Sequence, residues 1–404
     1  MSLSQQAYVE NDYLIEKNYQ HYIKYMGSKS KIMNFVVSGI NEVYKGGMIC
    51  DLFAGSASLS GAIGHQAPIH SNDIQKYSSV VAGAYLKTWN DGKVPDSKKI
   101  IKQATAIVQR NKRLLPELIS YDKNMSLDDF KAVEVSQQNI INLDFEGDWY
   151  LFAKYYSGTW WTAEQCLWID ALREVAENYR DSPSYWLILS SLMYAMAYTS
   201  QGTGHYAQYR DAKTISSMKD ISIYRKRDLT SYFTKKYDIA LHQLPQNKPI
   251  YSHKITSLDY QDCLNSFEGG TVYADPPYCF VHYSRFYHAL ETLVLYDYPE
   301  IQVKSGSMVK GRYRENRHQS PFSIKTQVKN AFTNLLTGVF ETDSNLVLSY
   351  SNTGMISLEE ILSLSEEIFI NKNVDFVSID HKHMTMGRQN DRDRDVKECL
   401  ILIS

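Results

Sequence analysis

Residues 48–61 read Met-Ile-Cys-Asp-Leu-Phe-Ala-Gly-Ser-Ala-Ser-Leu-Ser-Gly. A short apolar run ends at Asp51, and a turn containing Gly55 leads into a helical pattern. Glycine permits a tight turn and lets a ligand approach the backbone, as in dinucleotide-binding folds. The spacing is not Gly-x-Gly-x-x-Gly, because Ala57 stands where the second glycine would be, and no Gly-Lys-Ser/Thr follows. The stretch therefore predicts a strand, turn and helix without a phosphate cradle.

Six further runs have the same apolar, β-rich character. They span residues 68–73, 253–258, 271–275, 345–350, 375–380 and 396–403. Near-continuous apolar strands separated by helical stretches are typical of a mainly parallel sheet with both faces covered. The last two runs flank the charged stretch 386–395, which indicates the tip of a hairpin. The sequence predicts an α/β fold with a Rossmann-like, seven-stranded mixed sheet.

The character of the sequence changes between the strands predicted at 68–73 and 253–258. Residues 97–119 and 163–179 look helical, and residues 184–198 are apolar almost all round. We therefore expect residues 1–88 and 248–404 to form the two parts of the α/β domain. Residues 89–247 are expected to form a mostly helical insertion.

Length and composition limit the class of protein but do not identify its function. The 404 residues exceed the usual size of a single hydrophobic core, and the formal net charge of −2 does not indicate a polyanionic partner. The 31 tyrosines suit either a nucleic-acid surface or a core. No apolar run approaches the length of a membrane span. The cysteines lack short paired spacing, which predicts neither a zinc site nor a disulfide framework and favours a reducing cytoplasm; they are Cys50, Cys166, Cys263, Cys279 and Cys399.

Carboxylates follow the first two predicted strands. Asp51 precedes the glycine turn, and Asp73 ends the next strand, where an acid can accept hydrogen bonds from both hydroxyls of a ribose. S-adenosylmethionine carries an ammonium, a sulfonium and a ribose, so it fits carboxylates and glycine better than a pyrophosphate does. The alternative interpretation is structural, because an Asp at a strand end is often a turn or N-cap residue.

The tetrapeptide Asp275-Pro276-Pro277-Tyr278 directly follows the strand 271–274. The two prolines fix the backbone and remove two backbone hydrogen-bond donors, which is compatible with a plain rigid turn. The tetrapeptide also suits chemistry on the N6 amine of adenine, which is a poor nucleophile. Asp275 and the Pro276 carbonyl can accept the two amine hydrogens, and Tyr278 offers a ring on which a flipped base can stack. Positioning and electrostatics would then supply most of the rate enhancement.

These motifs together resemble the Dam-like adenine-N6 DNA methyltransferases, over residues 22–85 and 250–403. The segment 24–29 resembles the element that contacts the methionine part of the cofactor, and Asp259 the acid that contacts the cofactor's adenine. The resemblance implies S-adenosylmethionine as cofactor, duplex DNA as substrate, and no metal. The implied cofactor-binding residues are Tyr25, Gly27, Lys29, Asp51, Phe53, Ala54, Gly55, Ser56, Asp73, Ile74, Asp259, Tyr260 and Asp275.

Basic and polar clusters are the candidates for contacts with DNA. Phosphate contacts by Lys and Arg supply most non-specific affinity, and amide and guanidinium groups read base edges. A charge cluster is, however, more often a solvated face. The candidates are His205, Gln208, Arg210, Arg225, Arg227, Tyr283, Arg285, Arg312, Arg314, Arg317 and Arg388, with Lys235 and Lys236 as further phosphate contacts.

Two rival functions stay open at this point. Methylation of N4 of cytosine uses the same geometry, although the leading Asp and the order of motifs favour adenine; RNA is a less favoured substrate. A different class of function is a non-catalytic DNA-recognition subunit of a restriction or phage-defence complex. The intact set of Asp73, Asp259, Asp275 and Tyr278 argues against it, because pure binding gives no physical need for all four. A cognate restriction or defence protein in a bacterium or phage is the expected partner.

Overall fold

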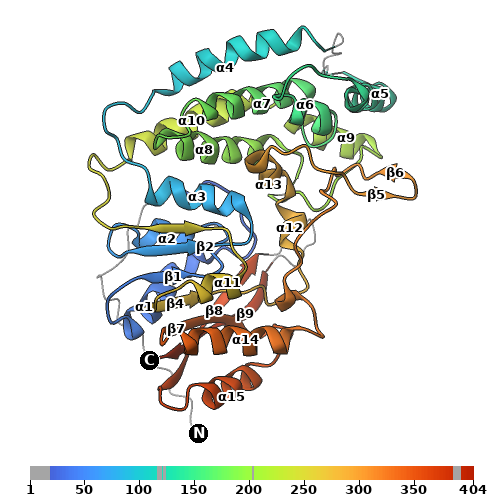
Figure 1. The fold of residues 1–404 in the computed structure, drawn as a ribbon. Coiled ribbons are helices and arrows are strands. Elements are labelled where there is room, and N and C mark those ends of the chain that lie inside the picture. The colour runs from blue at the N-terminus through green and yellow to red at the C-terminus, as the bar shows by residue number, and fades with distance from the viewer. Residues whose placement is uncertain (1–18, 116–120, 122–123, 203, 385–392) are drawn as a thin grey trace.

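The computed structural model describes residues 19–115, 121, 124–202, 204–384 and 393–404, arranged as an α/β half and a helical half (Figure 1). The α/β half holds a seven-stranded sheet in the order β3-β2-β1-β4-β7-β9-β8. All seven predicted strands are confirmed, with small changes at their ends. They are β1 (Ile49–Asp51), β2 (Ile69–Asn72), β3 (Lys254–Thr256), β4 (Thr271–Ala274), β7 (Asn345–Ser351), β8 (Val374–Met384) and β9 (Asp393–Ile403).

The sheet is mixed, as predicted. The strands β3, β2, β1, β4 and β7 pair in parallel, whereas β9 runs antiparallel between β7 and β8. The pairing of β8 with β9 confirms the hairpin, whose tip lies outside the described residues. Because the first five strands are parallel, their carboxyl ends meet at one edge of the sheet.

Alternation along the strands sorts side chains between two apolar layers. Ile49 and Tyr273 pack under α1 (Met33–Val43) and α2 (Ser58–Ile63), while Cys50 and Val272 face the opposite layer. This period of two is the expected geometry of a strand buried on both faces. The opposite layer is covered by α11 (Tyr260–Asn265), α14 (Val328–Glu341) and α15 (Leu358–Ile368).

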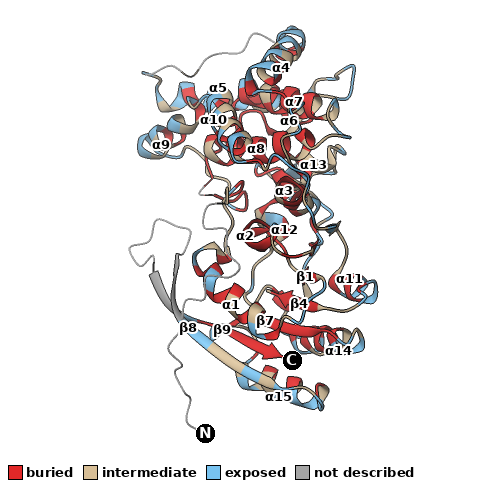
Figure 2. Ribbon diagram, turned by 90° about the vertical axis from the view of Figure 1, so that its left-hand side faces the viewer, coloured by how far each residue is buried: buried red, intermediate tan, exposed pale blue. Residues whose placement is uncertain are grey.

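The helical half is built around α7 and α8, whose inward faces are buried throughout (Figure 2). Side-chain N-caps begin several of its helices; at α7, Thr162 and Gln165 form a capping box. The helix predicted at 97–119 ends earlier, at Lys112. The helices are α4 (Ser97–Lys112), α5 (Leu127–Gln138), α6 (Leu151–Tyr156), α7 (Ala163–Glu177), α8 (Ser184–Thr199), α9 (Ile215–Arg225) and α10 (Leu229–His242).

Two helices outside residues 89–247 also pack into the helical half. Apolar side chains of α3 (Lys76–Leu86) and α13 (His288–Leu295) belong to the same core cluster as α7 and α8. Glu291 of α13 accepts the backbone N–H groups of Lys76 and Tyr77 at 3.1 Å, so it caps α3. The chain after the sequence-predicted catalytic loop therefore returns to the helical half and includes α12 (Tyr283–Phe286) and the small hairpin of β5 (Val303–Lys304) and β6 (Ser307–Met308). Among the described residues, no helix is both long enough and apolar enough to span a bilayer.

Candidate active site

One cavity lies at the carboxyl ends of the parallel strands. Because these ends meet at one edge, the acids that follow β1, β2, β3 and β4 converge on the same space, although they are up to 224 positions apart in the sequence. The cavity is lined by every residue that the sequence assigned to the cofactor or to catalysis: Tyr25, Gly27, Lys29, Asp51, Phe53, Ala54, Gly55, Ser56, Asp73, Ile74, Asp259, Tyr260, Asp275, Pro276, Pro277 and Tyr278.

The turn after β1 depends on two residues with positive φ. At Gly55 (φ 51°), a Cβ atom would lie 2.7 Å from the Tyr25 hydroxyl, so the close approach requires glycine. Ala57 also has a left-handed conformation (φ 52°), which costs a non-glycine residue about 1–2 kcal/mol. Its methyl group is fully buried in the core and does not line the cavity. Having Ala57 in place of a second glycine therefore costs backbone strain but does not narrow the cavity.

Asn72 fixes the relative positions of the strand ends. Its amide donates to the carbonyls of Leu52 and Leu258 at 3.2 and 3.1 Å, and its Oδ1 accepts from the Leu258 N–H and the Thr256 hydroxyl. The loops after β1 and β3 are thereby tied to β2. Asn72 is a positioning residue for the cavity, because it holds the loop that follows Asp51 and the loop that carries Asp259.

A buried carboxylate, Asp51, and a half-buried one, Asp73, give the cavity a preference for cationic ligands. Burial raises the pKa of Asp51 well above its ordinary range, and the neighbouring Asp275 and Asp73 raise it further. Burial also raises the pKa of Asp73 to about 6, although the N–H groups of Gln75 and Gly55 hydrogen-bond its oxygens at 2.9 and 2.8 Å. None of the ion pairs among the described residues includes Asp51. A cationic ligand would offset this accumulated negative charge.

Lys29 lies between two carboxylates. Its Nζ is 3.2 Å from Asp275 Oδ1 and also hydrogen-bonds Glu398, which is fully buried on β9. Burial would lower the pKa of Lys29, but Asp275 and Glu398 together raise it. Burial raises the pKa of Asp275 to about 6, against the attraction of Lys29 and together with the repulsion of Glu398. Sequence reasoning missed Glu398; the available signal was a lone acid within the apolar run 396–403.

Glu398→Gln is expected to lower the pKa of Asp275 below about 6. The substitution removes a repelling charge and leaves Lys29 to pair with Asp275 alone. Carboxyl NMR titration of protein labelled at aspartate measures this pKa, with the resonance assigned through Asp275→Asn. Ser349→Ala is the control, because it removes a neutral donor 3.1 Å from Glu398 without changing charge. An unchanged pKa in Glu398→Gln would contradict the coupling.

Tyrosines form one wall of the cavity. Tyr25 stacks on both Tyr287 and Tyr283, with ring centroids 4.8 and 5.6 Å away, and the Tyr287 hydroxyl accepts the Met26 N–H at 2.7 Å. These contacts hold the segment that carries Gly27 and Lys29 against the start of α12. Tyr278 lines the cavity beside Asp275, with the Lys29 ammonium 5.3 Å from its ring centroid.

The fold brings together cysteines that the sequence separates. The sulfurs of Cys50 and Cys263 lie 3.9 Å apart, and His70 Nε2 lies 3.9 Å from Cys263 Sγ, with all three residues buried. The spacing argument against a zinc site did not anticipate this cluster. The hydroxyl of Thr256 donates to Asn72 Oδ1, so it must accept from His70 Nε2 at 2.8 Å. That nitrogen therefore carries a proton, and in this arrangement it is no metal ligand.

The candidate DNA contacts differ in accessibility. Gln208 and Arg285 are exposed, and the half-buried ones are Arg210, Arg227, Arg317 and Tyr283. Arg388 lies outside the described residues. Arg285 and Arg317 lie with His282 and His318 in a basic cluster beside the cavity, which His318 lines. Burial lowers the pKa of His282, and repulsion from these three neighbours lowers it further.

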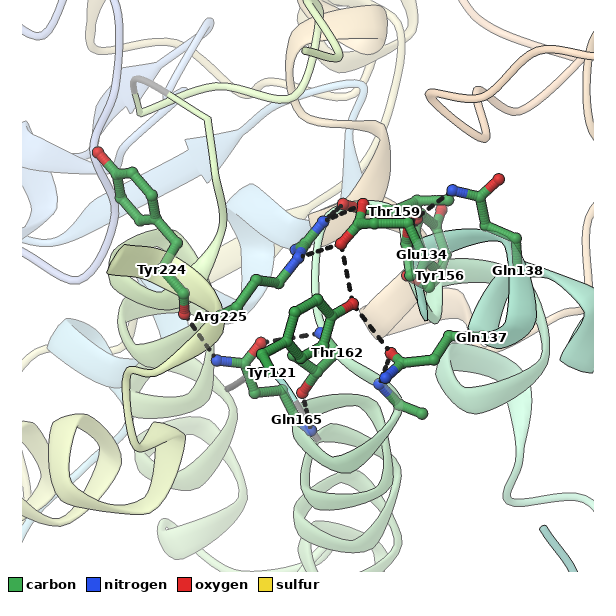
Figure 3. A network of polar contacts seen from close by, with 12 residues as sticks. Tyr121, Glu134, Gln137, Gln138, Tyr156, Thr159, Thr162, Gln165, Tyr224 and Arg225 are labelled. Atoms are coloured by element: carbon green, nitrogen blue, oxygen red, sulfur yellow. Dashed lines mark hydrogen bonds and ion pairs between the residues drawn. The ribbon is translucent and has the colours of Figure 1, made fainter. Parts of the chain in front are cut away.

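Arg225 is a structural residue rather than a DNA contact in this conformation. Its side chain is fully buried, and its guanidinium donates to both oxygens of Glu134 at 2.8 and 3.0 Å and to the Thr159 carbonyl (Figure 3). Tyr121 donates to the same carboxylate at 2.8 Å. The network joins α5 and α9 to the loop before α7. Arg225 is therefore removed from the candidate set, because none of its charge reaches the surface.

Four other sequence candidates are corrected for related reasons. Arg312 is buried and donates to the Tyr155 carbonyl at 3.1 Å, and Arg314 makes a bidentate pair with Asp297 at 2.7 and 2.6 Å. His205 is buried against Phe286, and burial lowers its pKa to about 4. Lys236 is buried, and burial lowers its pKa to about 8. His205, Arg312 and Lys236 are buried and Arg314 is paired with a carboxylate, so none of the four is exposed and free to bind a phosphate.

Comparison with known families gives a match across most of the chain. Residues 25–361 match the family model described as D12 class N6 adenine-specific DNA methyltransferase. The matched region includes the glycine turn, the acids at the strand ends and the tetrapeptide at 275–278, and also spans the helical half.

Curated relatives are distant but extensive. Modification methylase LlaI of Lactococcus lactis subsp. lactis is 22% identical over 379 residues, covering 91% of this chain and 52% of the relative. Type II methyltransferase M.FokI of Planomicrobium okeanokoites is 24% identical over 349 residues, covering 85% and 46%. Type II methyltransferase M.NlaIII of Neisseria lactamica is 22% identical over 359 residues, covering 85% and 88%. The chain thus spans about half the length of the first two relatives and most of the third.

Proposed function

Because the chain belongs to the D12 class of N6 adenine-specific DNA methyltransferases, we propose that it transfers the methyl group of S-adenosylmethionine to N6 of a flipped adenine in duplex DNA. The observation that carries this proposal is the single cavity in which Asp51, Asp73 and Asp275 meet at the carboxyl ends of β1, β2 and β4. The relatives' names, modification methylase and type II methyltransferase, favour a role in restriction-modification. A cognate nuclease as partner, and the cytoplasm of a bacterium or its phage as location, are part of the same proposal.

The cofactor would lie along the strand ends. The electronegative environment of Asp51 and Asp73 suits a ligand that carries an ammonium and a sulfonium. Both oxygens of Asp73 retain lone pairs beyond their backbone hydrogen bonds, so they can also accept from ribose hydroxyls. Asp259 and Tyr260, after β3, would contact the adenine moiety. When bound, S-adenosylmethionine supplies an electrophilic methyl group on its sulfonium.

The tetrapeptide would activate the target amine. Asp275 can accept one N6 hydrogen and the Pro276 carbonyl the other, which draws the nitrogen lone pair out of the ring. Tyr278 offers a stacking face beside them. Lys29 holds the Asp275 carboxylate at the cavity wall, and Glu398 holds Lys29 in turn. Pre-positioned acceptors of this kind lower the barrier without a covalent intermediate.

The helical half would recognise the DNA. We assign this role to residues 89–247, together with the segment that follows the catalytic loop, since both contribute to one core. Arg285 and Arg317, in the basic cluster beside the cavity, would contact phosphates near the flipped base. Gln208 is the exposed member of the loop 204–211 and can read a base edge.

Asp73→Asn is expected to weaken the binding of S-adenosylmethionine at pH 7.5 by roughly 1.5–3 kcal/mol, or about 10- to 150-fold in Kd. The amide has neither the charge nor both acceptors of the carboxylate. In the wild type, affinity should fall as pH is lowered through about 6, where Asp73 takes up a proton. Titration calorimetry at several pH values measures both effects. Equal affinity in mutant and wild type would exclude Asp73 from the cofactor site.

Nucleoside mass spectrometry tests the proposed reaction. Unmethylated duplex DNA is incubated with the protein and S-adenosylmethionine carrying a deuterated methyl group, then digested. We expect labelled N6-methyladenine, and far less of it from the Asp275→Asn variant in the same time. Labelled N4-methylcytosine would overturn the choice of base. Labelling of RNA but not DNA would overturn the substrate, and no labelling of any nucleic acid would leave only a binding role.

A further inference from the structure

Cations and tyrosines from distant parts of the chain form one patch on the surface. We define the Tyr198 patch as Lys24, Tyr198, Tyr224, Arg227 and Tyr232. The Lys24 ammonium lies 3.8 Å from the Tyr198 ring centroid, and Tyr198 stacks on Tyr232 at 5.5 Å. The Arg227 guanidinium lies 4.5 Å from the Tyr224 ring and 5.9 Å from the Tyr232 ring. The rings therefore hold two cations close together on partly exposed surface.

The positive charge of this patch is not compensated within the described protein. None of the ion pairs formed among the described residues includes Lys24 or Arg227. Burial lowers the pKa of Lys24, and repulsion from Arg227 lowers it further. The acid next to Arg227 in sequence, Asp228, is engaged as the N-cap of α10 by Thr230 and Ser231. Like charges held together are unfavourable unless an anion binds across them.

Two further lysines lie close to the patch residues in sequence. Lys226 directly precedes Arg227, Lys235 follows Tyr232 by three positions on α10, and both are exposed. A row of ammonium, guanidinium and phenol groups fits the sugar-phosphate backbone, which accepts charged and neutral hydrogen bonds along its length. The tyrosine rings keep the cations ordered before binding, so less side-chain entropy is lost on contact. The chemistry thus matches a polyanion better than a single small anion.

The patch is connected to the cavity through both of its segments. Lys24 directly precedes Tyr25, which lines the cavity and stacks on Tyr283 and Tyr287. Tyr198 lies just before the loop 204–211, where the Tyr206 N–H donates to the Phe286 carbonyl at 2.7 Å. The patch is therefore joined, through short stretches of chain, to residues that line the cavity or contact the segment after the tetrapeptide.

We propose that the Tyr198 patch binds the phosphate backbone of duplex DNA next to the target base. This inference rests on the proposed function in taking DNA as the substrate. It also gives Lys24 a second role, because a phosphate held there orders the segment that carries Tyr25 and Lys29. DNA contact and the active-site ion pair are then linked through five residues of chain.

The slope of log Kd against log salt concentration tests the proposal. The probe is a short fluorescent duplex of arbitrary sequence, and each phosphate contact contributes about 0.9 to the slope. The double variant Lys24→Gln, Arg227→Gln is expected to reduce the slope by about 1.8 relative to wild type. The matched control is Lys98→Gln, Lys102→Gln, which removes the same charge from the exposed face of α4 at the far end of the helical half (Figure 1) and should leave the slope unchanged.

Three outcomes would overturn the proposal. They are an unchanged slope in the patch variant, an equal reduction in the control, and tighter binding of duplex RNA than of DNA through the same residues. A thermal melt checks that each variant is folded, and Tyr198→Phe, which removes only a hydroxyl, serves as the milder variant. If wild type methylates DNA but the slope does not change, the patch proposal fails alone. If wild type binds DNA through the patch but transfers no methyl group, the proposed function fails and the patch stands.

Discussion

Replacing Asp275 with asparagine is expected to lower the rate of methyl transfer by roughly 10²–10³-fold, the cost typical of losing one pre-positioned electrostatic group. The amide keeps the shape of the carboxylate but not its charge, so it is a weaker acceptor for an N6 hydrogen. Lys29 keeps Glu398 as a partner, so the variant leaves no unpaired buried cation. Single-turnover kinetics with labelled S-adenosylmethionine measures the chemical step apart from product release.

Measuring the stability of the variant distinguishes a loss of catalysis from a loss of the fold. The raised pKa of Asp275 means that its proton is bound more tightly in the folded state, so above about pH 6 the ionised carboxylate costs folding free energy. Asp275→Asn is therefore expected to melt at the same or a higher temperature at pH 8, while still binding duplex DNA. Near-normal turnover would refute the catalytic assignment, and a lower melting temperature would refute the electrostatic account.

Glu134→Ala is expected to destabilise the helical half by about 3–5 kcal/mol, because it leaves the buried Arg225 without its carboxylate. Arg225 donates to both oxygens of Glu134, and Tyr121 donates to one of them, so three hydrogen bonds are lost together. Chemical denaturation monitored by tryptophan fluorescence reports this loss, since Trp160 and Trp161 lie beside Thr159 in the same half of the molecule.

An exposed ion pair provides the matched control. Arg110 and Glu174 lie 2.8 Å apart with the arginine side chain 57% exposed, so Arg110→Ala should cost no more than about 1 kcal/mol. If Arg225 were instead a DNA contact, Arg225→Ala would weaken DNA binding and leave the unfolding transition in place. A small effect of Glu134→Ala on stability would restore Arg225 to the candidate DNA contacts.

The sheet and the cavity could be predicted from the sequence for a local reason. Apolar runs of strand length can be recognised without knowing which strands they pair with, and all seven proved to be strands. Because parallel strands place their carboxyl ends at one edge, the acids that follow them had to converge. Asp51, Asp73, Asp259 and Asp275 accordingly line one cavity. Tertiary packing was needed only to give the order of the strands.

What only the tertiary structure decided is which polar side chains have partners. A sequence shows that Arg225, Arg312 and Lys236 are basic, but not that each is buried. The pairing of Glu398 with Lys29 spans 369 positions, and the contact of Lys24 with Tyr198 also joins distant segments. Burial and pairing depend on surfaces brought together from far along the chain, whereas strand formation depends on neighbours within a few residues. The apolar pattern therefore determined the framework and the edge of the sheet where the acids converge, and the long-range packing determined which charged side chains are buried with partners and which stay exposed.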